Sequence, residues 1–456
     1  MASTRLTRTM GTPTLGTKFT YSCWVKRGAL GTPSTMASMW IDGNNHIVLR
    51  FDLQDNLNFY AYVGSSSLLE LETNAVFRDT SAFYNIVVKV DTTQLTASDR
   101  CKLYVNGQEQ TSLSTATYPS QNATFSPNAS GTPHYVGGRG DSTAYFGGLI
   151  SYFAFVDGAA YDASYFGETD SSSGIWKIKT SPSVTYGNNG FFLKMDTATP
   201  GADSSGKNNT FSPSGSPTLA QDNASNNFTT LNPLARYYSD TSSLSNGNNT
   251  YSITSYTFNA RSTIAMPSGK WYWEVKQSAD NCRLGVCTSG FNPNIDTDDA
   301  GAYYGGSTGF GGVYIMNTGP STNWQITNNN TSKNVTTYTN GVATGANTIL
   351  SVAVDVDAGK LWVGVNGTWL YSGDPAAGSG EQIAFTNSSP DPLQAFIGFN
   401  SVNARVAQCN FGNGFFGVTA VTTSPAKTDG AGHGKFQYTV PTGFYTLNTK
   451  NLNTYG

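Results

Sequence analysis

The sequence is poor in charge, cysteine and histidine, and it has no long hydrophobic run. Charged residues make up 12% of its 456 residues, against about 25% in an ordinary soluble domain. A formal net charge of −3 offers no basic surface for nucleic acid or for an anionic membrane. Because no stretch of about 18 apolar residues occurs, we expect no membrane span.

The five cysteines and three histidines form no recognisable catalytic or metal-binding pattern. An odd number of cysteines at irregular spacing is not a disulfide framework, and we expect all five to be buried or inert thiols. His46, His134 and His433 lie next to Asn, Pro or Gly in predicted turns. No nucleophile elbow, zinc motif or P-loop occurs, so we predict a protein that is not an enzyme and needs no cofactor.

Glycine, aromatic residues and small polar residues take the place of the missing charge. Apolar and polar residues alternate in many segments, which is typical of half-buried strands; examples are 19–25, 86–90, 101–105 and 271–275. Asn-Gly dipeptides such as Asn106-Gly107 supply hairpin turns. The sequence therefore predicts an all-β fold with two antiparallel β-sandwich (jelly-roll-like) domains joined by a polar connector.

Shifts in composition divide the chain into four parts. We place the first sandwich at 1–170 and a Ser/Gly/Asn-rich connector at 171–227. The connector contains a strand-like island at 190–196 that we expect to return to the first domain and close it. A second alternating series predicts the other sandwich at 228–417, and an extended C-terminal segment follows at 418–456.

A short pattern occurs once in each predicted domain. Val88-Lys-Val-Asp91 leads to an Asn-Gly turn at 106–107, and Val354-Asp-Val-Asp357 leads to another at 366–367. Both are hairpins followed by a second turn. We interpret them as reuse of a common sandwich hairpin rather than as a duplication.

Polysaccharide hydrolysis is the one enzymatic activity that we keep open. A glycosidase needs two carboxylates about 5–10 Å apart, and Glu70 and Glu72 share one face of a predicted strand. The E-x-D-x-x-E arrangement of sandwich-type glucanases does not occur. We therefore rank polysaccharide degradation below two non-enzymatic functions.

Two loop motifs have both a functional and a structural interpretation. Asp296, Asp298 and Asp299 offer oxygen ligands of the kind that Ca²⁺ prefers, although a solvated acidic loop is the commoner arrangement. Arg139-Gly140-Asp141 is an integrin-type tripeptide. Because a glycine-rich chain produces this tripeptide easily by chance, we interpret it as a turn.

Two parts of the sequence resemble known domain families. Residues 1 to about 170 resemble a concanavalin A-like, laminin-G-type domain; the matching segments are 19–26, 84–91, 103–107, 146–153 and 157–158. Residues 228–417 resemble a SPRY domain, on segments 269–275, 284–287, 354–362, 365–367 and 410–412. The usual Gly-Asp before the central SPRY strand is Ala346-Asn347 here, which puts that turn in doubt.

The order of these parts, with the terminus 440–452, resembles structural proteins of tailed phages, especially marine ones. The resemblance implies a virion protein exposed on the tail or capsid, made in the host cytoplasm without a signal peptide. Its implied partners are other virion proteins, further copies of itself as a homo-oligomer, and a host cell-surface glycan or envelope component.

Three functions follow, in order. The first is a tail-fibre or host-attachment protein that binds a host glycan. Many aromatic side chains and few charges suit this function, because aromatic rings stack on sugar faces and neutral polar groups bond to sugar hydroxyls. The second is an architectural role as a capsid decoration or head-fibre protein, and the third is polysaccharide degradation. Aromatic residues in or beside predicted loops are the candidate ligand contacts, with packing as the alternative for each: Tyr303, Tyr304, Trp324 and Trp369.

Overall fold

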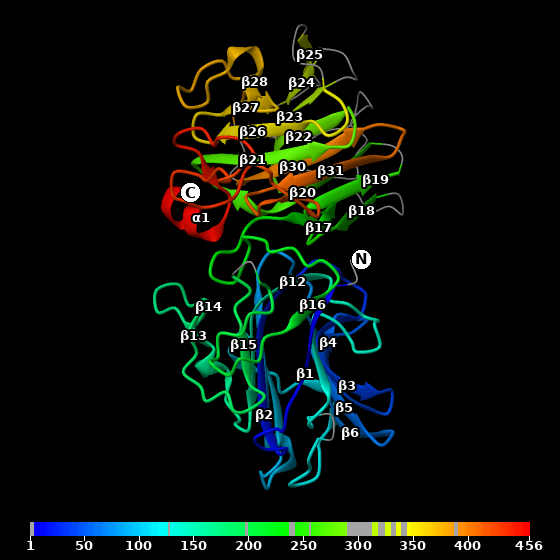
Figure 1. The fold of residues 1–456 in the computed structure, drawn as a ribbon. Coiled ribbons are helices and arrows are strands. Elements are labelled where there is room, and N and C mark those ends of the chain that lie inside the picture. The colour runs from blue at the N-terminus through cyan, green and yellow to red at the C-terminus, as the bar shows by residue number, and fades with distance from the viewer. Residues whose placement is uncertain are drawn as a thin grey trace. The chain divides into compact units, whose positions relative to one another are not determined.

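The computed structural model divides the chain into two compact units (Figure 1). It describes residues 4–125, 128–196, 199–236, 242–254, 257–289, 312–317, 324–329, 334–338, 344–386 and 391–456. The first unit is Met1–Leu219 with Asn223–Ser225, and the second is Ala220–Asp222 with Asn226–Gly456. Both are built of antiparallel sheets, which confirms the predicted all-β class; the α-helix found in the described residues is α1 (Thr449–Tyr455).

The first unit contains an eight-stranded sheet in the order β10-β6-β5-β4-β3-β11-β1-β16. Its strands are β1 (Arg5–Thr9), β3 (Ser34–Asp42), β4 (Asn45–Phe51), β5 (Asn56–Val63), β6 (Ser66–Val76), β10 (Leu113–Thr117), β11 (Pro133–Val136) and β16 (Ser212–Ser214). One face of the central strands carries apolar side chains such as Leu49 and Phe59, which are 1% and 0% exposed. The other face carries polar and aromatic side chains.

A six-stranded sheet in the order β15-β12-β2-β7-β8-β9 supplies the second layer of the first unit. Its strands are β2 (Lys18–Arg27), β7 (Tyr84–Asp91), β8 (Cys101–Val105), β9 (Gln108–Glu109), β12 (Gly148–Asp157) and β15 (Phe191–Leu193). The predicted alternation of β2 places Phe19, Tyr21, Cys23 and Val25 in the core shared with the eight-stranded sheet. The island at 190–196 forms β15, which pairs with β12.

The polar segment 171–219 belongs to the first unit rather than to a separate connector. Residues 159–170 and 176–186 pack on the outer face of the six-stranded sheet, where a second apolar cluster includes Phe166, Tyr186 and Phe192. This cover contains η2 (Ala163–Tyr165) and a hairpin of β13 (Gly167–Thr169) and β14 (Trp176–Ile178). A further short helix, η1 (Ala97–Asp99), joins β7 to β8.

The second unit pairs a seven-stranded sheet with a nine-stranded one. The seven-stranded sheet contains β17 (Leu231–Arg236), β20 (Thr257–Met266), β30 (Leu393–Asn400), β22 (Cys282–Cys287), β23 (Gly312–Asn317), β24 (Trp324–Asn329) and β25 (Asn334–Tyr338). The nine-stranded sheet runs β18 (Ser242–Ser245), β19 (Thr250–Ile253), β31 (Arg405–Asn410), β21 (Lys270–Gln277), β26 (Ile349–Asp355), β27 (Lys360–Val365) and β28 (Thr368–Trp369), with β29 (Ile383–Ala384) beside β27 and β34 (Tyr445–Thr446) beside β21. Their facing sides enclose one large apolar core.

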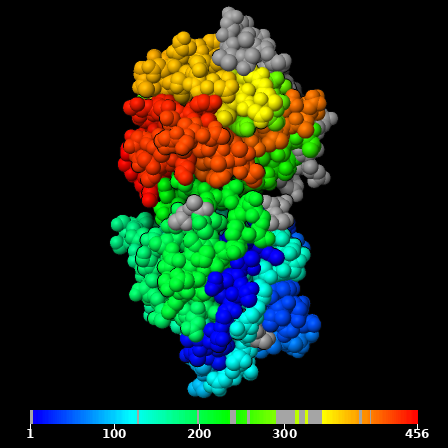
Figure 2. All heavy atoms as spheres, in the orientation of Figure 1, coloured from blue at the N-terminus to red at the C-terminus, as the bar shows by residue number. Residues whose placement is uncertain are grey.

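The C-terminal segment 418–456, which the sequence predicted to be extended, packs against the second unit. Its strand β34 pairs in parallel with β21. Phe436, Val440 and Phe444 pack against Tyr272 and Trp362 on the outer face of the nine-stranded sheet. In Figure 2 the C-terminal segment appears as the red patch on the surface of the second unit. The short pieces β32 (Phe415–Phe416), β33 (Thr419–Ala420) and η3 (Leu370–Ser372) complete the unit.

All five cysteines are free and buried, as the sequence predicted. Burial raises the pKa of each thiol, to about 12 for Cys287, so the reactive thiolate is disfavoured. In the described parts of the chain, no helix has the length and apolar character that crossing a membrane requires.

His134, which the sequence places in a turn, lies on β11 and points into the first unit's core. It is 2% exposed, both ring nitrogens lack a hydrogen-bond partner, and its ring packs edge-on against Phe155 at 5.4 Å. Burial lowers the pKa of His134 to about 3, from about 6.5 in an unfolded chain. The fold therefore holds the neutral imidazole.

Acid is expected to destabilise the first unit through His134. Between pH 6.5 and 3 the unfolded chain binds a proton that the folded chain excludes, so wild type loses about 1.4 kcal/mol of unfolding free energy per pH unit. His134→Phe and His134→Gln remove this slope while differing in packing. This slope is measured by urea unfolding of the full chain at pH 8 and at pH 4.5. Limited proteolysis at each urea concentration, with identification of the fragments, reports on the first unit separately. An equal acid loss in wild type and both variants contradicts the prediction.

Candidate functional site

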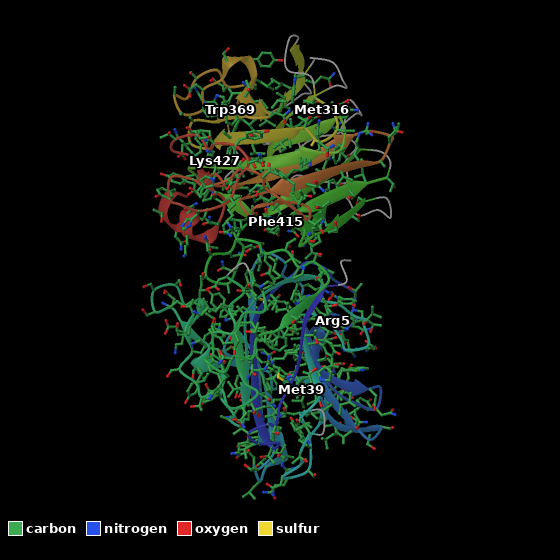
Figure 3. The ribbon with its side chains drawn as sticks, viewed as in Figure 1. Arg5, Met39, Met316, Trp369, Phe415 and Lys427 are labelled. Carbon is green, nitrogen blue, oxygen red and sulfur yellow. The ribbon has the colours of Figure 1, made fainter. Side chains whose placement is uncertain are left out.

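The outer face of the eight-stranded sheet in the first unit carries a group of aromatic side chains. The register places Trp40 of β3 opposite His46 of β4, and His46 opposite Tyr62 of β5. Their neighbours along the strands, such as Met39 (Figure 3) and Ile47, point into the core. Alternation along each strand therefore sends these three rings to the face away from the core.

The three rings form a continuous stack across three strands. The Trp40 and His46 ring centroids are 4.4 Å apart with an interplanar angle of 18°, and those of His46 and Tyr62 are 5.2 Å apart at 23°. Tyr60 meets His46 edge-on at 5.6 Å. Burial lowers the pKa of His46, although a hydrogen bond to the Asp42 carbonyl opposes this. The His46 ring is therefore neutral at pH 7, and the stack bears no charge of its own.

Three arginines place their guanidinium groups over aromatic rings of the same sheet. The guanidinium carbon of Arg5 is 4.4 Å from the Tyr135 ring centroid, and that of Arg50 is 4.9 Å from Tyr60. The guanidinium carbon of Arg139 is 5.4 Å from the Trp40 ring centroid. Such cation–π contacts fix the planes of otherwise flexible side chains.

The tripeptide at 139–141 forms a turn beside this stack, as predicted. The Ser142 backbone N–H donates to the Arg139 carbonyl at 3.1 Å. The Arg139 Nε donates to Asp141 at 3.0 Å, and Thr143 donates to the same carboxylate. Burial alone would raise the Asp141 pKa, but these bonds lower that pKa to about 2. Asp141 is thus an ionised partner of its own neighbour.

Arg5 and Gly140 hold this turn on the sheet. Arg5 donates to the Arg139 carbonyl and to the Ser142 hydroxyl. A Cβ at Gly140 would come within 2.2 Å of the Trp40 side chain, so only glycine allows the turn to approach the indole so closely.

Glu70 and Glu72 lie on the same outer face, on β6, as the sequence predicted. Glu72 accepts hydrogen bonds from Asn58 Nδ2 at 3.4 Å and from the Ser114 hydroxyl at 2.8 Å. Asn58 in turn accepts from Arg50 Nε at 3.1 Å. A polar chain from Arg50 through Asn58 to Glu72 therefore crosses the sheet beside the aromatic stack.

Of the four residues proposed from sequence as ligand contacts, the structure describes Trp324 and Trp369. Tyr303, Tyr304, Asp296, Asp298 and Asp299 lie outside the described residues. Within the described ranges, no group of three or more His, Cys, Asp or Glu residues is placed to hold a metal ion.

The interpretation of Trp324 as a ligand contact is wrong. Trp324 is 0% exposed and lies in the core of the second unit. It begins β24 and pairs with Asn317 on one side and Tyr338 on the other, so its indole offers no surface to a ligand. Trp369 ends β28 at the edge of the nine-stranded sheet (Figure 3) and is half-buried. Its ring meets Tyr272 edge-on at 6.4 Å.

The matched family covers the strands that carry the outer-face residues. Residues 5–163 match the model of the concanavalin A-like lectin/glucanases superfamily. The first unit carries a concanavalin A-like, laminin-G-type domain. This laminin-G-type domain includes every residue of the aromatic stack and of the polar chain beside it. No curated protein matches the sequence.

Solved structures with similarity to the chain include both of the folds that the sequence resembles. The TRIM65 PSpry domain is 17% identical over 40% of this chain and 91% of its own, with a TM-score of 0.28. The SPRY domain of human HERC1 is 15% identical over 39% of this chain and 96% of its own, with a TM-score of 0.27. Domains LG4-5 of the mouse laminin alpha1 chain are 10% identical over 89% of this chain and 85% of their own, with a TM-score of 0.28.

Proposed function

We propose that this chain is a phage virion protein that attaches to the host by binding a surface saccharide on the outer face of the eight-stranded sheet. The observation that carries the binding role is the stack of Trp40, His46 and Tyr62 across three strands. Aromatic rings beside fixed polar groups suit a sugar, which has apolar C–H faces and a rim of hydroxyls. The virion role rests on the sequence resemblance.

The polar chain beside the stack supplies the complementary hydrogen-bonding groups. The Glu72 carboxylate accepts hydrogen bonds only, so it suits sugar hydroxyls as donors. The Arg50 guanidinium donates only, and it suits hydroxyl or ring oxygens as acceptors. Because Asn58 is 0% exposed and bonded to both groups, these groups keep their positions before a ligand arrives. Such preorganisation reduces the entropic cost of binding.

Replacing Tyr62 tests the binding face. Tyr62→Ala removes the half-buried end of the stack and is expected to weaken binding to a host envelope polysaccharide about 5–10-fold, the value of one aromatic contact. Tyr62→Phe keeps the ring and should bind nearly as wild type. The matched control is Tyr165→Ala, which removes a 40% exposed tyrosine from the cover of the other sheet. Equal affinity of Tyr62→Ala and Tyr165→Ala contradicts this site.

Counting the chain in purified particles tests the virion role. A few copies at the tail support attachment. Hundreds of copies on the capsid favour the alternative, an architectural decoration protein, and contradict attachment as the main role. Absence from the particles contradicts both.

A further inference from the structure

Arg50 presents an unpaired guanidinium fork on the binding face. It is half-buried in β4, and its Nε donates to Asn58 Oδ1 at 3.1 Å. Its Nη1 and Nη2 have no hydrogen-bond or ion-pair partner among the described residues, and neither is a buried atom. Four N–H donors of a held group are therefore without a partner in the described parts of the chain.

The surroundings of Arg50 fix this fork in one plane. Tyr60, which lies under the guanidinium, is 7% exposed and is itself held edge-on by His46. Asn58 is fully buried and bonded to Glu72. An arginine side chain normally loses about 2 kcal/mol of rotamer entropy when a ligand immobilises it. Here folding has already imposed that cost.

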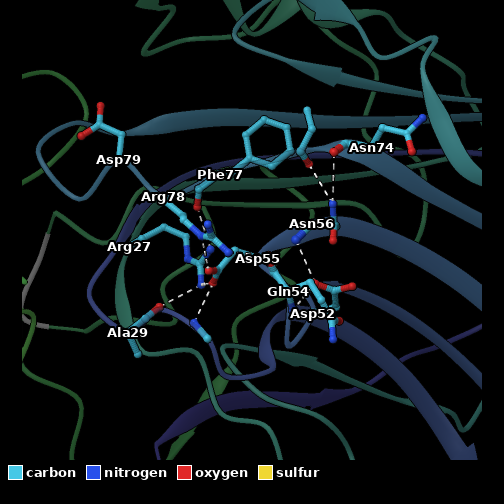
Figure 4. Close-up of polar contacts among 12 residues, drawn as sticks. Arg27, Ala29, Asp52, Gln54, Asp55, Asn56, Asn74, Phe77, Arg78 and Asp79 are labelled. Atoms are coloured by element: carbon cyan, nitrogen blue, oxygen red, sulfur yellow. Dashed lines mark hydrogen bonds and ion pairs between the residues drawn. The ribbon is translucent and has the colours of Figure 1, made fainter. Parts of the chain in front are cut away.

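Other arginines of the first unit that are held as firmly have their charge or their donors engaged. Arg27 and Arg78 both pair with Asp55 at 2.8 Å (Figure 4), and Arg139 pairs with Asp141. Arg100 directs three of its nitrogens to backbone carbonyls. Arg50 combines a fixed plane with an open fork, which is the geometry that receives a carboxylate or a sulfate through two parallel hydrogen bonds.

We propose that the saccharide bound by this face is anionic, with an acidic substituent on the Arg50 fork and its ring on Tyr62; this inference rests on the proposed function. Tyr60 links the two contacts, since its ring centroid is 4.9 Å from the Arg50 guanidinium carbon and 6.0 Å from the Tyr62 centroid. That spacing accommodates one sugar residue together with its substituent. The Glu72 carboxylate, held by buried Asn58, then faces the hydroxyls on the other side.

Three probes with the same backbone separate charge from sugar recognition. Dextran is neutral, carboxymethyl-dextran carries carboxylates and dextran sulfate carries sulfate esters. The full wild-type chain is expected to bind one acidic probe at least tenfold more tightly than dextran, with an affinity that falls as salt rises. The acidic probe that binds more tightly identifies the substituent as a carboxylate or a sulfate.

Variants assign the preference to Arg50. Arg50→Gln should abolish the acidic preference, and Arg50→Lys, which keeps the charge but not the fork, should retain only part of it. Lys89→Gln removes an equal charge from β7 in the other sheet and should bind as wild type. Unchanged thermal unfolding of Arg50→Gln and Arg50→Lys shows that neither result reflects misfolding.

Two results overturn the inference. One is equal binding of dextran and both acidic probes, and the other is an acidic preference that survives in Arg50→Gln. If none of the three probes binds while host polysaccharide binding still depends on Tyr62, the anionic ligand is wrong and the proposed function stands. If neither the probes nor host polysaccharide bind, the proposed function fails as well.

Discussion

Replacing Glu274 by alanine is expected to remove about 2–6 kcal/mol from the unfolding free energy of the second unit. The Glu274 side chain lies on β21, is 0% exposed and accepts four hydrogen bonds. The donors are the Tyr272 hydroxyl at 3.0 Å, Asn410 Nδ2 at 3.2 Å, Gln437 N at 2.9 Å and Tyr438 N at 2.8 Å. The Tyr272 hydroxyl and Asn410 Nδ2 keep second acceptors, the Ser351 hydroxyl and the Lys435 carbonyl. The two backbone N–H groups would be left unsatisfied, at a cost of about 1–3 kcal/mol each.

Two of these donors are backbone groups of the C-terminal segment, so Glu274 fastens that segment to the sheet. Glu274→Ala should therefore also speed proteolysis near Gln437, in addition to lowering the midpoint of urea unfolding. The control is Glu381→Ala, because Glu381 forms a partly exposed ion pair with Lys360 at 3.4 Å and should cost no more than about 1 kcal/mol. If both variants unfold and are cleaved alike, Glu274 does not fasten the segment.

Glu274→Gln adds a readout that packing does not affect. Burial raises the pKa of Glu274, and its hydrogen bonds offset this only in part. A raised folded pKa gives stability that is complete below the unfolded value, about 4.3, and is lost as pH rises through the folded value. Wild type should therefore gain stability relative to Glu274→Gln as the pH falls from 7 toward 4.5. The His134 effect in the first unit has the opposite sign.

Alternation along the sequence predicted the inward faces of the strands but not the site on an outward face. The run Asn58-Phe-Tyr-Ala-Tyr62 already shows two tyrosines on one face of a predicted strand. Placing Tyr62 beside His46 and Trp40, however, requires the register of three strands, which depends on hairpin geometry that a composition pattern does not contain. The sequence pattern instead favours aromatics in predicted loops as ligand contacts. For Trp324 this is wrong, because the polar residues around it hide a strand, β24, whose first side chain lies in the core.

Polar composition also misled the domain boundary at 171. Segment 171–219 is ordered by side chains that bond to backbone rather than by apolar residues alone. Asp203 accepts from Phe192 N and Asn209 N, and Asn209 donates to the Gly190 carbonyl. Asn and Asp favour such local bonds, and a sequence rich in them is indistinguishable from a flexible connector.

The repeated Asn-Gly hairpin has a common structure in the two units. Asn106 Oδ1 accepts from Asn85 N at 2.8 Å, and Asn366 Oδ1 accepts from Ile349 N at 3.0 Å. A Cβ on either following glycine would come within 2.6 Å of an aromatic ring, Trp176 in the first unit and Tyr438 in the second. Those rings belong to the segments that cover each sheet, so each turn helps to position its cover.

Replacing Asp55 is expected to cost the first unit about 3–5 kcal/mol, the usual loss when a buried ion pair is broken from one side. Asp55 Oδ1 accepts from Arg27 Nη2 and Gly31 N, and Oδ2 accepts from Arg78 Nε, all at 2.8 Å (Figure 4). Arg27 is 1% exposed and would keep its charge with two backbone carbonyls as its remaining acceptors.

Asp55→Asn is the informative variant, because Asp55 has a φ of 71° and asparagine tolerates this left-handed backbone while alanine does not. Urea unfolding of the first unit measures the loss, and Asp99→Asn, in an exposed pair with Lys102, should change it by no more than about 1 kcal/mol. Adding Arg27→Met to Asp55→Asn removes the stranded charge, so the double variant should be more stable than Asp55→Asn alone. If the double variant loses as much unfolding free energy as Asp55→Asn and Arg27→Met lose together, the uncompensated charge of Arg27 is not the cause.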